Sequence, residues 1–149
     1  MKKYFLLFSI LIITLSACNK NQVTAQAAVD EAKIQAYMKA NNIQATKDAS
    51  GIYYQVITPG TGPYPIATST IKYSYIGKYL NGQQFDQGSS YSSVLNTTVQ
   101  GFQLGIPHIN AGGRLLLIVP SALGYGSAGS GSIPANAVLV FTIDLQSFY

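Results

Sequence analysis

The residues of this chain that could carry chemistry are a tyrosine, an aspartate and several aromatic rings. Tyr125 begins a glycine- and serine-rich loop, GYGSAGSGSIPAN (124–136), which leads through an Ile-Pro step into an apolar strand. Asp86 directly follows Phe85. A carboxylate beside buried rings needs hydrogen-bond donors, and Tyr75 could supply one. Such groups can surround and orient a ligand, and their chemistry requires no nucleophile.

The composition argues against several other kinds of site. The sequence contains no phosphate-cradling loop with a lysine, no Cys/His cluster and no calcium loop, and its only histidine, His108, has no acidic or nucleophilic neighbour in sequence. We therefore expect no metal, no cofactor and no Ser-His-Asp hydrolase. The formal charge of +4 falls to +2 once the two lysines of the first 17 residues are removed. The remaining basic residues are spread singly, which does not favour nucleic acid as a partner.

The N-terminus is predicted to be a lipoprotein signal peptide over residues 1–17. Lys2 and Lys3 precede an apolar stretch, 4–15, which is too short for a stable transmembrane helix. The stretch LSAC (15–18) resembles a bacterial lipobox, so we expect acyl chains on Cys18 and a mature chain that begins there. Cys18 is the only cysteine, and no intramolecular disulfide can form.

The elements that must position the candidate residues begin with a helix. Residues 19–27 are polar and small, as in a tether. Ile34, Tyr37 and Met38 recur at i, i+3 and i+4 and predict a helix over 29–41. This helix could pack on the domain, act as a spacer or dimerise, and its weak apolar stripe favours packing or a spacer.

From residue 51 the pattern changes to strands. Strands are predicted over 52–57, 70–80, 114–119 and 137–148, a returning strand begins at 83–86, and a short helix lies within 99–109. Asn81-Gly82 favours a type I′ hairpin turn. This order predicts an α+β fold in which an antiparallel sheet curls over a small helix.

Three stretches in this order resemble FKBP-type peptidyl-prolyl isomerases. GKYLNGQQFD (77–86) is similar to the family's hairpin, and VQGFQLGIPHINAGGR (99–114) is similar to its helix and the turn after it. PSALGYGSAGSGSIPANAVLVFTIDL (120–145) resembles the family's tyrosine-containing loop, Ile-Pro step and closing strand. The resemblance implies a strongly curved antiparallel half-barrel wrapped over one short α-helix. The chain then divides into the signal peptide (1–17), a tether with an extra N-terminal helix (18–48) and an FKBP-type isomerase domain (49–149).

The resemblance also assigns residues to a site. It implies that the catalytic residues are Asp86, Tyr125, Phe85 and Phe102. It implies that the substrate-binding residues are Tyr75, Tyr91, Val99, Ile133 and Phe141. In the family the loop tyrosine donates a hydrogen bond to a substrate carbonyl, and the backbone N–H at the position of Val99 faces the ligand. The alternatives are a surface tyrosine at position 125 and ordinary core packing for the phenylalanines.

The sequence departs from the family's pattern at three places. These departures bear on the expected catalytic strength and macrolide binding more than on the expected fold. Phe102 stands where the family usually has tryptophan, and Ser93 stands where a second wall aromatic often lies. The segment between Asp86 and Tyr91 is short and has no arginine to pair with the aspartate.

The function implied is that of a prolyl isomerase. An X–Pro amide crosses a barrier of roughly 20 kcal/mol, and an apolar aromatic cleft would favour its less polar twisted state. The expected partners are proline-containing segments of exported proteins, together with a membrane that holds the lipid on Cys18. We expect the protein to be located in the bacterial cell envelope and to face the periplasm. The outer membrane is favoured over the inner membrane because Asn19, the residue after the lipidated cysteine, is not acidic.

Two other readings compete with the isomerase. The first is a catalytically weak or inactive peptide-binding or chaperone module of an envelope complex. The second is a structural lipoprotein whose tyrosines make an adhesive surface, and it predicts no preference for proline.

Overall fold

The computed structural model describes residues 24–149. The predicted signal peptide, the lipid site at Cys18 and the first part of the tether lie outside these residues. Within 24–149 no helix is both long enough and apolar enough to cross a membrane.

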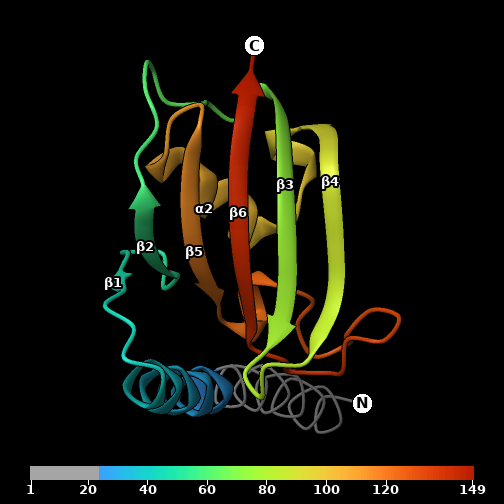
Figure 1. Ribbon diagram of the computed structural model, residues 1–149. Coiled ribbons are helices and arrows are strands. Elements are labelled where there is room, and N and C mark those ends of the chain that lie inside the picture. The colour runs from blue at the N-terminus through green and yellow to red at the C-terminus, as the bar shows by residue number, and fades with distance from the viewer. Residues whose placement is uncertain (1–23) are drawn as a thin grey trace, which may run out of the picture.

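The core of the fold is a six-stranded antiparallel sheet (Figure 1). Its strands are β1 (Thr46–Lys47), β2 (Tyr53–Thr58), β3 (Thr70–Tyr79), β4 (Gln84–Val94), β5 (Gly113–Val119) and β6 (Leu139–Phe148). They lie in the order β1-β2-β5-β6-β3-β4, so that β1 and β4 form free edges and the sheet does not close. The α+β half-barrel predicted from the sequence is confirmed.

One face of the sheet covers a short helix. α2 (Gln100–Gly105) lies between two 3₁₀ turns, η1 (Leu95–Thr97) and η2 (Ile106–His108), and is seen behind the sheet in Figure 1. A Cβ on Gly101 or Gly105 would lie 2.6 Å from the Val119 or Leu117 side chain, respectively. These glycines lower helix propensity, but they let the helix approach β5 closely.

The core under α2 comes from alternate positions of the inner strands. One face of β6 points toward the helix, and its four apolar residues are buried in one cluster with it: Leu139, Phe141, Ile143 and Leu145. Phe102 and Ile106 contribute the helix side of this cluster.

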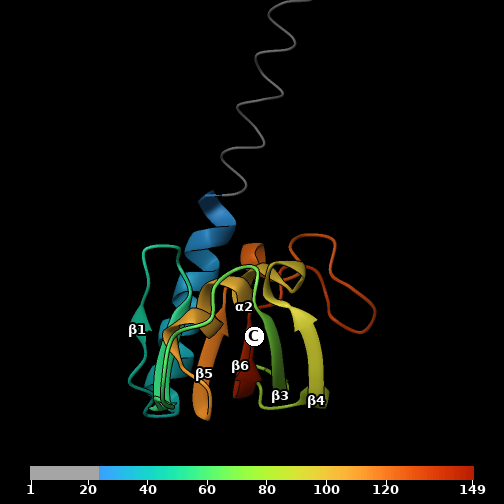
Figure 2. The same cartoon turned by 90° about the horizontal axis from the view of Figure 1, so that it is seen from above.

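The N-terminal helix covers residues 24–40 and packs on the domain, as one of the predicted alternatives had it. It begins earlier than predicted, so that residues 24–27 are helical and not part of a tether. Ile34 is fully buried in a second cluster with Tyr53, Ile118 and Val140. The helix crosses the end of the sheet at which the β3–β4 hairpin and the 124–136 loop also lie, at the bottom of Figure 1, and Figure 2 shows it from above.

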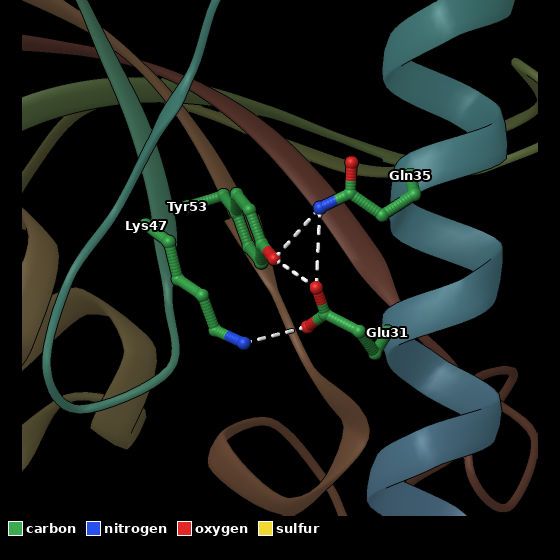
Figure 3. A network of polar contacts seen from close by, with 4 residues as sticks. All are labelled: Glu31, Gln35, Lys47 and Tyr53. Carbon is green, nitrogen blue, oxygen red and sulfur yellow. Dashed lines mark hydrogen bonds and ion pairs between the residues drawn. The ribbon is translucent and has the colours of Figure 1, made fainter.

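A polar network also anchors this helix, to β1 and β2 (Figure 3). Glu31 pairs with Lys47 Nζ at 2.8 Å and accepts hydrogen bonds from the Tyr53 hydroxyl and from Gln35 Nε2. The hydrogen bonds from Lys47 and Tyr53 lower the pKa of Glu31 to about 2.

The turn between β3 and β4 differs from the prediction. A type I′ turn needs positive φ at both central residues, but only Gly82 has it, at +86°. The Gly82 N–H donates to Tyr79 O at 2.9 Å, and the Tyr79 N–H donates to Gln83 O at 2.9 Å. The loop therefore has three residues, 80–82. Asn81 keeps a negative φ because its side chain accepts the Gln83 N–H at 2.9 Å.

Candidate active site

The site is built on aromatic rings that meet between α2 and the sheet. Phe102 of α2 and Phe141 of β6 are almost completely buried, and their ring centroids lie 4.8 Å apart at 84°. Phe85 and Tyr75 approach Phe141 at 5.7 and 6.4 Å, also edge to face. This geometry is the one that aromatic quadrupoles favour. It brings together four of the predicted site residues from α2, β3, β4 and β6.

Two residues that the sequence reasoning missed shape this cluster. Tyr73 is buried, and its ring lies 5.9 Å from Phe102. The alternation of Ile71, Tyr73 and Tyr75 on one face of β3 was the available signal. Gly77 is the second, because a Cβ there would lie 2.6 Å from the Phe85 ring. A glycine inside a strand often marks such a close approach.

Asp86 and Tyr75 form the polar contact expected at the edge of the cluster. The Tyr75 hydroxyl donates to Asp86 Oδ2 at 2.6 Å, while Asp86 Oδ1 accepts the Gln87 N–H at 2.8 Å. Burial, followed by the hydrogen bond and the charge of Asp86, raises the pKa of Tyr75. The phenol therefore stays protonated and holds the carboxylate in place.

Tyr125 comes from another part of the chain and follows the short turn η3 (Ser121–Leu123). It is 38% exposed, and its hydroxyl has no hydrogen-bond partner among residues 24–149. Partial burial, and then the charge of Asp86, raises the pKa of Tyr125. Its O–H is therefore a protonated donor that is available to a ligand. Ile133, at the far end of the loop, packs into the aromatic core.

The remaining predicted residues lie on two other sides. Val99 is the N-cap of α2, and across the described part of the chain its N–H donates to no backbone carbonyl. Tyr91 of β4 is exposed, and its ring lies 6.2 Å from Tyr75. The segment predicted as a short loop is a bulge within β4, where the pairing steps from Gly88 to Tyr91 and Ser90 has a φ of +54°.

His108 lies outside this cluster. Its ring stacks on Tyr54 at 3.8 Å, and its Nε2 lies 3.5 Å from Asp48. No group of three or more His, Cys, Asp or Glu side chains suited to a metal occurs within residues 24–149.

An open cavity of the domain adjoins the aromatic cluster and shares Phe85 with it. It has a volume of about 830 Å³ and lies among the N-terminal helix, the hairpin and the 124–136 loop. Phe85 and Tyr79 line it, and their rings are 5.0 Å apart. The Tyr79 hydroxyl donates to Ser132 O at 2.8 Å and so joins the hairpin to the loop.

Comparisons with known proteins agree with this fold. The family of FKBP-type peptidyl-prolyl cis-trans isomerases matches residues 62–146. The FKBP-type peptidyl-prolyl cis-trans isomerase FkpA of Aeromonas hydrophila is 34% identical over 139 residues, which are 88% of this chain and 51% of that protein. FkpA of Escherichia coli (strain K12) is 34% identical over 125 residues, covering 80% of this chain and 46% of that protein.

Comparison with solved structures also finds peptidyl-prolyl cis-trans isomerases. The crystal structure of FkpA from Escherichia coli has a TM-score of 0.73 at 30% identity, over 87% of this chain and 63% of that one. A peptidyl-prolyl cis-trans isomerase from Pseudomonas syringae pv. tomato has a TM-score of 0.71 at 27% identity, over 83% of this chain and 93% of that one.

The chain belongs to the FKBP-type peptidyl-prolyl cis-trans isomerase family, since the family's match covers more than half of it. It spans about half the length of the FkpA proteins that it matches.

Proposed function

We propose that the chain is a peptidyl-prolyl cis-trans isomerase of the bacterial cell envelope that assists the folding of exported proteins. The observation that carries this proposal is the aromatic cluster edged by the Tyr75–Asp86 hydrogen bond, together with the Tyr125 hydroxyl, which has no partner among residues 24–149 and is influenced by the charge of Asp86. An apolar surface flanked by fixed polar groups is suited to a peptide bond that loses polarity as it twists.

The chemistry requires neither a nucleophile nor a metal. Rotation about an X–Pro bond breaks amide resonance and crosses a barrier of roughly 20 kcal/mol. The twisted amide is less polar than the planar one, so a water-poor aromatic surface binds it better than water does. Phe85, Phe102 and Phe141 supply that surface, and Ile133 forms a wall beside it.

Polar groups then orient the peptide. The hydroxyl of Tyr125 and the N–H of Val99 would each donate to a substrate carbonyl, because neither has a partner in the described chain. Asp86 contributes its field and fixes Tyr75, and it takes no proton in the reaction. Tyr91 lies on the exposed wall, where it can contact the residue before proline.

The test is isomerisation of a set of X–Pro peptides by the full-length chain in detergent. Wild-type protein should accelerate exchange, and Tyr125→Phe should lower kcat/KM about tenfold, the equivalent of one hydrogen bond of roughly 1.4 kcal/mol. Asp86→Ala should lower it further, because Tyr75 then loses its acceptor. Lys78→Ala, an exposed change on β3, serves as the control.

No acceleration by folded protein, across all residues before proline, would sink the enzyme proposal. It would favour the second candidate, a peptide-binding or chaperone module of an envelope complex. A specific observation supports that candidate: Phe102 and Ser93 reduce the aromatic surface, and the open cavity adjoins the cluster, sharing Phe85 with it. Proline-dependent binding without acceleration would then be the expected result.

We also propose that the chain is anchored by acyl chains on Cys18, faces the periplasm and resides at the outer membrane. Residues 1–17 would act as its signal peptide, with domain boundaries at 18 and 49. The support is the LSAC stretch in the sequence. Proline-containing segments of exported chains would be its substrates.

A further inference from the structure

The N-terminal helix carries a buried carboxylate that touches the base of the Tyr125 loop. Asp30 is 2% exposed. Its Oδ2 accepts the Ser121 N–H at 2.8 Å and the Ser121 hydroxyl at 2.6 Å, while its Oδ1 accepts Gln26 Nε2 at 2.7 Å. A buried carboxylate is tolerated only when its oxygens are hydrogen-bonded. The hydrogen bonds between Asp30 and Ser121 therefore join the helix to the base of the loop, although the two residues are 91 positions apart in the sequence.

Ser121 in turn organises the backbone around Tyr125. Its carbonyl accepts the N–H of Gly124 at 3.1 Å and the N–H of Gly126 at 2.8 Å. The Gly126 N–H belongs to the peptide unit that follows Tyr125, and the Gly124 N–H belongs to the unit one residue before it, so one carbonyl oxygen holds the backbone on both sides of the tyrosine. Gly126 has a φ of +60°, a conformation that glycine adopts readily because it has no Cβ, so the sequence suits this turn.

Gly126 also makes a contact to the far end of the loop. The carbonyl of Gly126 accepts the Asn136 N–H at 2.9 Å. The chain of contacts therefore runs from Asp30 through Ser121 and Gly126 to Asn136, the last residue of the loop. The apolar contacts of this helix, by contrast, reach the sheet through Ile34.

We propose that Asp30 is a positioning residue for Tyr125, and that the N-terminal helix is thereby a working part of the isomerase site. The helix lies outside residues 62–146, which the family matches. The inference rests on the proposed function. If Asp30 is removed, the N–H and hydroxyl of Ser121 lose their acceptor in a buried place, and the turn that presents Tyr125 loosens.

Glu31 provides a matched control on the same helix. It too anchors the helix through hydrogen bonds and an ion pair, but to Lys47 and Tyr53 of β1 and β2. Glu31→Gln therefore weakens docking of the helix without touching the Tyr125 loop. A purely structural role for Asp30 predicts that the two positions behave alike.

The experiment compares full-length wild type, Asp30→Ala, Asp30→Asn and Glu31→Gln in detergent, at a temperature where urea titration shows each to be folded. We expect Asp30→Ala to lower kcat/KM about tenfold or more, as a small misplacement of an orienting group does. Asp30→Asn keeps an acceptor oxygen and should recover part of the loss. Glu31→Gln should stay within about twofold of wild type.

Two further measurements keep the test decisive. Ser121→Ala should lower kcat/KM in the same direction, and adding it to Asp30→Ala should cost little more, because both changes break one contact. The backbone amide NMR signals of Gly124, Tyr125 and Gly126 should shift in the Asp30 variants and stay in place in Glu31→Gln.

Equal activities for Asp30→Ala and Glu31→Gln, with unmoved signals from the loop, would overturn the proposal and leave Asp30 as a mere anchor of the helix. The NMR comparison separates this outcome from a failure of the proposed function. If wild type accelerates no peptide, the loop signals still report whether Asp30 positions Tyr125. If Asp30→Ala does not fold, Asp30→Asn and Ser121→Ala carry the same comparison.

Discussion

At the scale of single residues, the site depends on how closely atoms approach one another. Phe85 can lie against β3 because Gly77 has no side chain, and Tyr75 can hold Asp86 because burial keeps its phenol protonated. Neither contact involves a rare residue type. The chemistry of the site therefore depends on spacing more than on reactive groups.

The close contact at Gly77 predicts the effect of adding one methyl group. Gly77→Ala should displace the Phe85 ring, destabilise the fold by about 1–3 kcal/mol and lower kcat/KM, because the new Cβ would overlap the ring. Urea unfolding and peptide isomerisation measure the two effects, with Lys78→Ala as the control. Wild-type stability in Gly77→Ala would show that Phe85 has room to move.

For a substitution of Ser93 we predict the opposite effect on stability. Its hydroxyl is buried and has no hydrogen-bond partner within residues 24–149. Ser93→Ala should leave stability unchanged or raise it by up to about 1 kcal/mol, because an unsatisfied buried hydroxyl is removed. Thermal unfolding beside Ser92→Ala, an exposed neighbour, checks this. A loss of stability larger than that of Ser92→Ala would indicate an unseen partner for the hydroxyl.

At the scale of elements, the N-terminal helix and α2 lie on different parts of the sheet and are held differently. α2 is packed tightly through Gly101 and Gly105 and contributes Phe102 to the cluster. The N-terminal helix combines the apolar contact of Ile34 with the carboxylates of Asp30 and Glu31. Because the pKa of Glu31 is lowered, the docking of this helix should respond to pH, while the packing of α2 should not.

The pKa of Glu31 sets the direction of that response. It is lowered to about 2 from 4.5, so the bound carboxylate stabilises the folded state above pH 4.5, and this stabilisation is lost as the pH falls toward 2. The side chain is 39% exposed, and solvent screening limits the effect to about 1 kcal/mol or less. Urea unfolding of wild type and Glu31→Gln should differ at pH 7 and converge near pH 2. An equal difference at both pH values would contradict this account.

At the scale of the whole molecule, the N-terminal helix follows the proposed lipid site, Cys18, in the sequence. If Cys18 is acylated, wild-type chain expressed in bacteria should incorporate a labelled fatty acid, and Cys18→Ala should not. Mass spectrometry of the N-terminal peptide identifies the modified residue. An unlabelled wild type would refute anchoring by lipid and leave the isomerase proposal intact.

Much of the fold could be predicted because its signals are local. The alternation of apolar and polar residues in 70–80 and 137–148 produces two long strands, since side chains of a strand point to opposite faces in turn. The order of the Phe-Asp, Gly-Phe and Tyr-Gly steps identified the family and most of the residues around the cluster. Boundaries were less accurate, as the early start of the N-terminal helix shows.

Only the tertiary structure decided the contacts between distant segments. The Asp30–Ser121 hydrogen bonds, the Glu31–Tyr53 contact, the place of Tyr73 in the cluster and the bulge at Ser90 have no local signature. Sequence periodicity specifies which face of an element is buried, because that depends on neighbours along the chain. The side chains that contact this buried face depend on how the sheet curls and how the elements pack. These contacts are therefore determined only when the whole chain has folded.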